Sequence, residues 1–190
     1  MEKKDEELML DFQKGDSRAL EEIFHRYKSR ILNFAIRMLG NRAEAEDVTG
    51  EVFLAFYRSC YSYRPEAKFS TWLFTVARNR CISRIRKNKG VLSLWVKSRE
   101  GQEAPVEIPD TSQISRDQVL KKEISKEVQM AIAGLPGEQK EAIILREYHH
   151  LSYEDISQVL NCSLEKVKIL IYRGREQLRT ELSSFIKGEK

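Results

Sequence analysis

The sequence predicts an all-α protein made of two small helical domains joined by a flexible linker. Apolar residues recur at helical spacings of three and four towards both ends of the chain. Four prolines and nine glycines are few for 190 residues, and they gather mostly in the middle. Almost no stretch alternates as a strand would. We therefore expect a first domain over residues 1–88, a linker over 89–116 and a second domain over 117–190.

Charge is segregated along the chain, although the net charge is only +4. Residues 78–89 carry six Lys and Arg and no acid, whereas residues 1–14 are acidic on balance. Segregation of this kind favours a basic surface for nucleic acid and a separate acidic surface for another partner. Charged residues make up 33% of the chain, above the usual quarter, so the surface must be heavily charged.

The three cysteines favour a cytoplasmic protein without a disulfide framework. Cys60, Cys81 and Cys162 are scattered, odd in number and form no Cys-x-x-Cys pair, so we expect no zinc site and no other cofactor. Each is expected to be a small buried apolar residue. The charged N-terminus and the lack of a long apolar run predict neither a signal peptide nor membrane insertion.

The first domain opens with two helices. A short helix over 5–14 should end at Gly15, and Asp16 or Ser17 should cap a longer core helix. The Gly-Asn pair at 40–41 should end that helix. Its apolar residues keep helical spacing: Leu20, Ile23, Phe24, Tyr27, Ile31, Phe34, Ala35 and Met38.

A third helix, over 43–57, carries an acidic flank. Glu44, Asp47 and Glu51 lie at spacings of three and four, where like charges repel mildly unless cations meet them. A solvated acidic face is the simplest interpretation. A carboxylate metal centre usually needs Glu-x-x-His on facing helices, and no His lies nearby, so we do not expect a metal here.

Aromatic and basic residues then mix in a predicted loop over 58–69. Tyr61, Tyr63 and Phe69 stand beside Arg64 and Lys68, a composition suited to holding the unstacked bases of a single strand. Alternatively, the rings pack down on the helices.

The next helix should start at a Ser70 cap and end near Lys87. Its apolar residues do not keep to one stripe, so it is either wedged between helices or covered by a partner. Thr71, Trp72 and Asn79, together with Arg80, add stacking and hydrogen-bonding groups near the loop. These observations extend the candidate nucleic-acid surface from the loop onto the helix.

The linker is inferred from Gly, Pro and Ser residues that interrupt all periodicity. Beyond it we expect a helix over 117–132, a turn at Pro136 and a helix over 138–148. His149 and His150 are expected to face solvent.

Residues 151–179 predict a helix-turn-helix. Ser152 should cap its first helix, with Asp155 at capping-box spacing, and Asn161 should end it. Ser163 should cap the second helix. That helix has one apolar side: Val167, Leu170, Ile171, Gly174 and Leu178. Its other side is basic with one aromatic residue: Lys168, Tyr172, Arg175 and Arg179, with Arg173 on the flank.

A helix with this pattern suits the DNA major groove, although an ordinary amphipathic surface helix would share it. Two of its residues stand out. Gly174 inside a helix indicates close approach of a neighbouring helix. Ile169 falls on the outward side, where it could touch a thymine methyl group or simply be a tolerated surface residue.

Three segments in this order resemble the bacterial sigma-70 family of RNA polymerase specificity subunits, in its extracytoplasmic-function group. They are AEAEDVTGEVFLAFY, KFSTWLFTVARNRCISRIRK and LPGEQKEAIILREYHHLSYEDISQVLNCSLEKVKILIYRGREQLR. The resemblance implies three partners: core RNA polymerase, promoter DNA and an anti-sigma protein.

The resemblance also implies roles for individual residues on three surfaces. Polymerase binding would fall to Glu44, Asp47, Glu51 and Leu54. The −10 element would be bound by Tyr63, Lys68, Phe69, Thr71, Trp72, Asn79, Arg80 and Arg84. The −35 element would be bound by Glu165, Lys166, Lys168, Tyr172, Arg173 and Arg175.

The sequence departs from the family pattern at a few positions. Relatives commonly carry polar or basic residues where Ile169 and Leu170 stand, and Ala at Gly174. Thr49 and Gly50 replace a more usual apolar-Gln pair. The first departures bear on the −35 sequence preference, and the last on details of polymerase contact.

Two other functions would fit parts of the sequence. A free-standing helix-turn-helix regulator would usually bind paired half-sites as a dimer, and it would leave the acidic flank and the aromatic loop unexplained. A nuclease would need a carboxylate cluster or an activated nucleophile. Asp47 and Glu51 are the only candidates, and both lie on one predicted helix, so we expect no enzyme activity.

Overall fold

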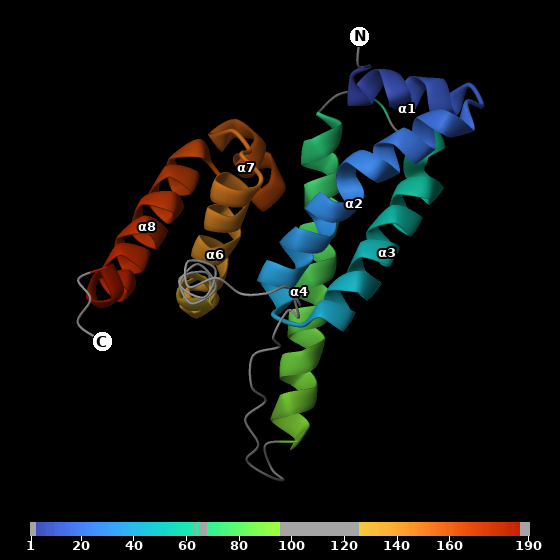
Figure 1. The fold of residues 1–190 in the computed structure, drawn as a ribbon. Coiled ribbons are helices and arrows are strands. Elements are labelled where there is room, and N and C mark those ends of the chain that lie inside the picture. Colours follow the sequence, from blue (N-terminus) through green and yellow to red (C-terminus); the bar gives the residue numbers. More distant parts are fainter. Residues whose placement is uncertain (1–2, 63, 65–67, 96–125, 187–190) are drawn as a thin grey trace, which may run out of the picture. The chain divides into compact units, whose positions relative to one another are not determined.

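A computed structural model describes residues 3–62, 64, 68–95 and 126–186 (Figure 1). These residues form helices and connecting turns and contain no strand, which confirms the all-α class. The chain divides into two compact units, Met1–Ala104 and Pro105–Lys190. Most of the predicted linker, and the predicted helix over 117–132 up to residue 125, lie outside the described residues, so the domain boundaries stay predictions.

The described residues of unit 1 form four α-helices and a short 3-10 turn. They are α1 (Asp5–Gln13), α2 (Ser17–Leu39), α3 (Arg42–Ser59), the 3-10 turn Cys60–Ser62 and α4 (Phe69–Trp95). Helices α2, α3 and α4 pack side by side, and α1 lies across one end of them (Figure 1). Their buried faces form one core that includes Ile23, Ile31, Phe34, Val48, Val52, Phe56, Phe69 and Phe74.

The predicted start and end of α2 are confirmed by its caps, while α3, expected over 43–57, is slightly longer and has a cap that was not predicted. Asp16 accepts a hydrogen bond from the Arg18 backbone N–H at 3.0 Å and caps α2. Gly40 ends α2 in the left-handed conformation, with φ of 71°. Asn41 caps α3 by accepting from the Glu44 backbone N–H at 3.0 Å. Each cap satisfies a backbone group that the helix itself leaves unpaired.

Helix α4 differs from the prediction at both ends. It begins at Phe69, so Ser70 lies inside it and is not its cap; Glu6 of α1 instead accepts a hydrogen bond from the Phe69 N–H at 3.0 Å. The helix also continues past Lys87 to Trp95. This extension includes Gly90, although glycine inside a helix costs about 1 kcal/mol relative to alanine.

The packing of α1 onto α2 also depends on Asp5. Its carboxylate accepts a hydrogen bond from the Tyr27 hydroxyl and pairs with Arg26 Nη1 at 2.9 Å. Burial, and then the bond to Asp5, raises the pKa of Tyr27 well above its ordinary value. The phenol therefore stays protonated and remains a hydrogen-bond donor at any physiological pH.

Unit 2 is also helical throughout its described part. Helical residues 126–134 come first, followed by α6 (Gly137–Ile143), one π-helical turn (Ile144–Tyr148), α7 (Tyr153–Leu160) and α8 (Leu164–Ile186). Pro136 stands at the N-cap of α6, as predicted. Helix α8 packs against both α6 and α7.

The helix-turn-helix formed by α7 and α8 has the predicted caps. Ser152 accepts from the Asp155 N–H at 3.1 Å, and Ser163 accepts from the Lys166 N–H at 3.2 Å. Asn161 ends α7 in the left-handed conformation, with φ of 51°. These local contacts set where each helix begins and ends, so the sequence alone was sufficient to predict them.

His149 corrects the expectation that both adjacent histidines face solvent. His150 is exposed, but His149 is only 6% exposed. The π-helical turn ends at Tyr148, and His150 then adopts a positive φ of 56°. This reversal of the chain places the two neighbouring side chains in different environments.

Gly174 lies where α8 crosses α6, as its place inside a helix suggested. A Cβ atom added there would stand 2.7 Å from Ile143 Cγ1 and 3.1 Å from Ile143 Cδ1. Because Ile143 is itself buried, this space can be filled only by moving a packed side chain.

Gly174→Val is therefore expected to destabilise unit 2 by about 1–3 kcal/mol through overpacking. Faster hydrogen–deuterium exchange in peptides from α6 and α8 of the full chain would show this. In the same measurement, Ile143→Ala should cost less in the Gly174→Val background than in the parent chain. Equal costs in the two backgrounds would contradict the assigned contact.

Candidate nucleic-acid and protein-binding surfaces

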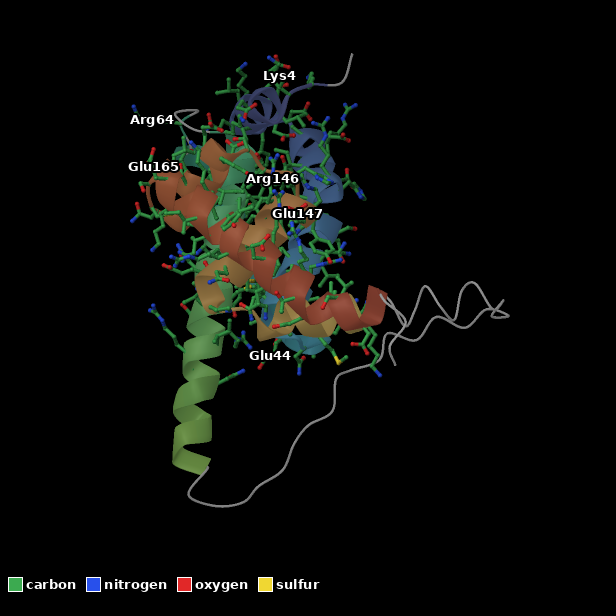
Figure 2. The ribbon with its side chains drawn as sticks, turned by 90° about the vertical axis from the view of Figure 1, so that its left-hand side faces the viewer. Lys4, Glu44, Arg64, Arg146, Glu147 and Glu165 are labelled. Carbon is green, nitrogen blue, oxygen red and sulfur yellow. The ribbon has the colours of Figure 1, made fainter. Side chains whose placement is uncertain are left out.

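The acidic flank runs along α3 and faces outward. The side chains of Asp47 and Glu51 are 70% and 42% exposed, and Leu54 on the same side is 57% exposed. Glu44, near the start of the helix, is half-buried (Figure 2). We call these four residues, the three acids and Leu54, the acidic strip. Their spacing places them on one side of α3, as predicted.

Two arginines and one asparagine of α4 contact the acids of this strip within the same chain. Arg84 Nη2 lies 2.9 Å from Glu51 Oε1, and Arg84 Nη1 lies 3.8 Å from Asp47 Oδ2. Arg80 Nη1 lies 3.8 Å from Glu51 Oε2, and Asn88 Nδ2 donates to Glu44 at 2.9 Å. The mild repulsion expected along the strip is therefore relieved by a neighbouring helix.

This pairing was missed at the sequence level, although a signal for it exists. Acceptors at 44, 47 and 51 meet partners at 88, 84 and 80, in reverse order and at matching helical spacing. That pattern is expected of two antiparallel helices in contact. The sequence did not show that α3 and α4 are neighbours. The matching positions of these acceptors and donors therefore could not be interpreted as contacts.

The residues expected to contact a melted strand differ in their exposure. Lys68, Asn79 and Arg80 are exposed, while Trp72 and Arg84 are half-buried. Phe69 and Thr71 are buried, at 0% and 2% exposure. Tyr63 lies outside the described residues.

The burial of Phe69 and Thr71 corrects their assignment to a DNA-contacting surface. The Phe69 ring packs edge-on against the rings of Tyr27 and Phe56, with both centroids 5.4 Å away. The first turn of α4 therefore enters the core between α2 and α3. The sequence placed Phe69 in an aromatic loop, and only the packing of α4 shows that this ring belongs to the core.

The α8 face, defined by Glu165, Ile169, Tyr172, Arg173 and Lys168, is exposed on the side away from the core of unit 2. Tyr172 and Ile169 are 67% and 49% exposed. On the opposite side, Val167, Leu170 and Ile171 are buried, as predicted. Figure 2 shows Glu165 at the first turn of the helix. The capped turn of the helix-turn-helix thus presents a charged, partly aromatic helix surface to solvent.

Two of the predicted −35 residues pair with acids of α6 and the π-helical turn. Lys166 Nζ lies 2.9 Å from Glu138 Oε1. Arg175 donates two hydrogen bonds to Glu147 Oε1, at 2.7 and 3.0 Å. These bonds raise the pKa of Arg175 and hold its guanidinium against its own domain. A phosphate or a base that binds Lys166 or Arg175 would compete with these two acids for their N–H groups.

The described residues contain no group of three or more His, Cys, Asp or Glu side chains placed to hold a metal ion. Cys60 and Cys81 are buried, as expected, whereas Cys162 is only half-buried. Burial raises the pKa of the Cys60 thiol, which donates to the Tyr57 carbonyl. No helix in the described part of the chain is long and apolar enough to cross a membrane.

Comparison with known proteins connects these surfaces to a family. Residues 23–91 match the family model of sigma-70 region 2, and residues 125–178 match that of sigma-70 region 4. The chain is 38% identical over 171 residues to the ECF RNA polymerase sigma factor SigW of Bacillus subtilis, covering 89% of this chain and 91% of the relative. It is 30% identical over 194 residues to the RNA polymerase sigma-H factor of Pseudomonas aeruginosa, covering 98% and 97%.

A solved structure has a similar fold. The sigma factor RpoE of Bartonella quintana, solved in complex with the anti-sigma factor NepR, aligns with a TM-score of 0.69 at 21% identity. The alignment covers 86% of this chain and 96% of that one. Together with the sequence matches over both units, this shows that the chain belongs to the sigma-70 family of RNA polymerase sigma factors, in its extracytoplasmic-function group.

Proposed function

We propose that this sigma factor binds core RNA polymerase through the acidic strip and places two helical modules on promoter DNA. The start of α4 would bind the melted −10 element, and the α8 face would read the −35 element in duplex form. The chain would act by binding energy alone, without catalysing a covalent step, in the cytoplasm where the polymerase works.

The observation that carries this proposal is that α8 has one buried apolar side and one exposed side with charged and aromatic residues. One side is anchored by buried Val167 and Ile171, while Lys168, Tyr172 and Arg173 are exposed on the other. A fixed helix with exposed cations and hydrogen-bonding groups can lie in a major groove, neutralise phosphates and reach base edges.

The polymerase surface is proposed from exposed charge next to exposed apolar area. Asp47 is 70% exposed, and Leu54 and Tyr57 are 57% and 54% exposed on the same helix. Interface centres combine apolar contact with charged groups at the rim, where complementary charge speeds association. A basic, partly apolar surface on the polymerase would match the strip.

The −10 surface is proposed in a corrected form. Lys68, just before α4, and Asn79 and Arg80 within it are exposed, and Trp72 and Arg84 of the same helix are half-buried. Tyr63 remains in the set as a prediction. Phe69 and Thr71 would support this surface from inside the core rather than touch DNA.

An anti-sigma protein is proposed as a further partner. The Bartonella relative was solved bound to one, and this chain shares its fold. Such a protein would compete with polymerase and promoter DNA for the same two units. The free-standing regulator is not favoured, because the relatives matched over both units are polymerase sigma factors.

Run-off transcription tests the proposed function. Purified bacterial core polymerase would be supplied with genomic fragments, with and without this protein. New start sites that share two spaced upstream elements are expected only when the protein is present. Absence of start sites, together with absence of binding to core polymerase, would overturn the proposal. Footprints on paired half-sites without polymerase would instead support the free-standing regulator.

A further inference from the structure

Ile169 occupies an unusual place on the α8 face. Its side chain is 49% exposed, while Val167 and Ile171 on the opposite side of the helix are 0% and 1% exposed. Glu165 and Arg173 stand four residues away in either direction, and both are exposed. Because residues four apart are neighbours on a helix surface, an apolar side chain lies in the middle of the charged face.

The fold of unit 2 gives no reason for this residue. The neighbouring departure from the family pattern, Leu170, is 8% exposed and belongs to the buried side of α8. Ile169 is turned the other way, where water would disfavour it. A single exposed apolar residue is common on protein surfaces, but this one lies at the centre of the surface proposed to enter the major groove.

The chemistry of the side chain restricts what it can read. Isoleucine neither donates nor accepts a hydrogen bond, so it cannot recognise the polar groups of guanine, adenine or cytosine. The major groove offers one apolar group on a base edge, the 5-methyl group of thymine. The exposed side chains around Ile169, such as Lys168 and Arg173, could contact phosphates and bases and so hold α8 in the major groove, close enough for Ile169 to reach a methyl group.

We propose that Ile169 determines specificity by packing against the 5-methyl group of one thymine in the −35 element. The inference rests on the proposed function, because it requires α8 to enter the −35 major groove. It goes further by assigning one base feature to one residue. Leu170 makes no such contact, since it packs inside unit 2.

Uracil substitution offers a test that changes one methyl group. Once run-off transcription has located the promoter, each thymine of the −35 element is replaced in turn by deoxyuridine, on either strand. Deoxyuridine keeps the hydrogen-bonding groups and lacks the methyl group. Binding of the holoenzyme is measured on each template. At one position, the parent protein is expected to bind about fourfold more weakly, as for one methyl-sized group left unburied.

Two variants make the test specific to Ile169. Ile169→Ala should bind the thymine and uracil templates equally at that position, and Ile169→Val should retain most of the difference. Lys168→Ala is the matched control on the same face. It should weaken both templates to the same degree, because a charge contact does not depend on the methyl group.

The inference is overturned if no −35 thymine shows dependence on its methyl group, or if the element contains no A·T pair. It is also overturned if the dependence persists in Ile169→Ala. Failure of the proposed function looks different, because no start site would then form on any template. Circular dichroism of Ile169→Ala should match the parent, since the side chain is half exposed and lies outside the core.

Discussion

Replacing Phe69 by alanine is expected to lower the free energy of unfolding of unit 1 by about 3–5 kcal/mol. The ring is fully buried and packs edge-on against Tyr27 and Phe56, with Trp72 at a centroid distance of 6.0 Å. Its removal would leave a cavity where α2, α3 and α4 meet, and the surrounding helices can collapse into it only in part. Promoter-directed transcription would be lost through unfolding, without loss of a DNA contact.

Urea unfolding followed by tryptophan fluorescence measures this effect in the full chain. Both tryptophans, Trp72 and Trp95, lie in α4, so their emission reports on unit 1. Arg80→Ala is the matched control on the same helix. Its side chain is 49% exposed, and its ion pair to Glu51 is long, so it should change stability by less than about 1 kcal/mol.

The pair of variants separates a core role from a DNA-contacting role. Phe69→Ala should lower stability and function together, and Arg80→Ala should lower promoter opening at nearly unchanged stability. A Phe69→Ala protein that unfolds like the parent but fails to open promoters would return Phe69 to the DNA-contacting surface.

Reversing two charges of the acidic strip should have the largest effect on function. The double variant Asp47→Lys/Glu51→Lys is expected to bind core polymerase at least about 100-fold more weakly, because like charges facing each other across an interface cost several kcal/mol. Binding is measured by fluorescence anisotropy of labelled sigma factor titrated with core polymerase. Affinity of the parent protein should fall as salt is raised, since the strip is exposed and therefore screened.

Glu46→Lys is the matched control for this double variant. Glu46 carries the same charge on the same helix, but it lies about 100° around from Asp47 and pairs with Arg42 at 2.9 Å. It should keep nearly all of the parent affinity. The double variant also places lysines beside Arg84, so its thermal unfolding is compared with that of the parent, and a loss of no more than about 1 kcal/mol is expected at these exposed positions.

Parent-like affinity in the double variant would exclude the strip from the polymerase interface. The acidic strip would then be a solvated face whose charge is balanced by Arg80 and Arg84. Equal losses in the double variant and in Glu46→Lys would point to a general effect of net charge instead of a defined contact surface.

Much of the fold could be predicted because it depends on neighbours in the chain. The caps at Asp16, Ser152 and Ser163 are contacts between residues two or three apart, and Asn161 ends its helix by its own backbone conformation. The buried side of α8 follows from helical spacing alone. Such features need no knowledge of which helices pack together.

The sequence-based predictions are wrong where a distant part of the chain decides the outcome. Helix α4 begins at Phe69 and not after a Ser70 cap, and the Phe69 N–H donates to Glu6, a residue 63 positions away in the chain. Phe69 is predicted in an aromatic loop and assigned to the DNA-contacting surface, because nothing local shows that it inserts between α2 and α3. His149 is buried by a reversal at the next residue, which adjacent histidines do not reveal.

Local patterns in the sequence were enough to predict most of the helices, the caps at Ser152 and Ser163, the two-sided α8 helix and the family. These features depend on periodicity, on hydrogen bonds between residues close in the chain and on motif order, and all three can be recognised in the sequence. Which charges are already paired and which rings are buried depends on how the helices pack against one another, and this was visible only in the folded chain. Arg80 and Arg84 meet the acidic strip because α3 and α4 run antiparallel in contact, and Phe69 is buried because the first turn of α4 inserts between α2 and α3.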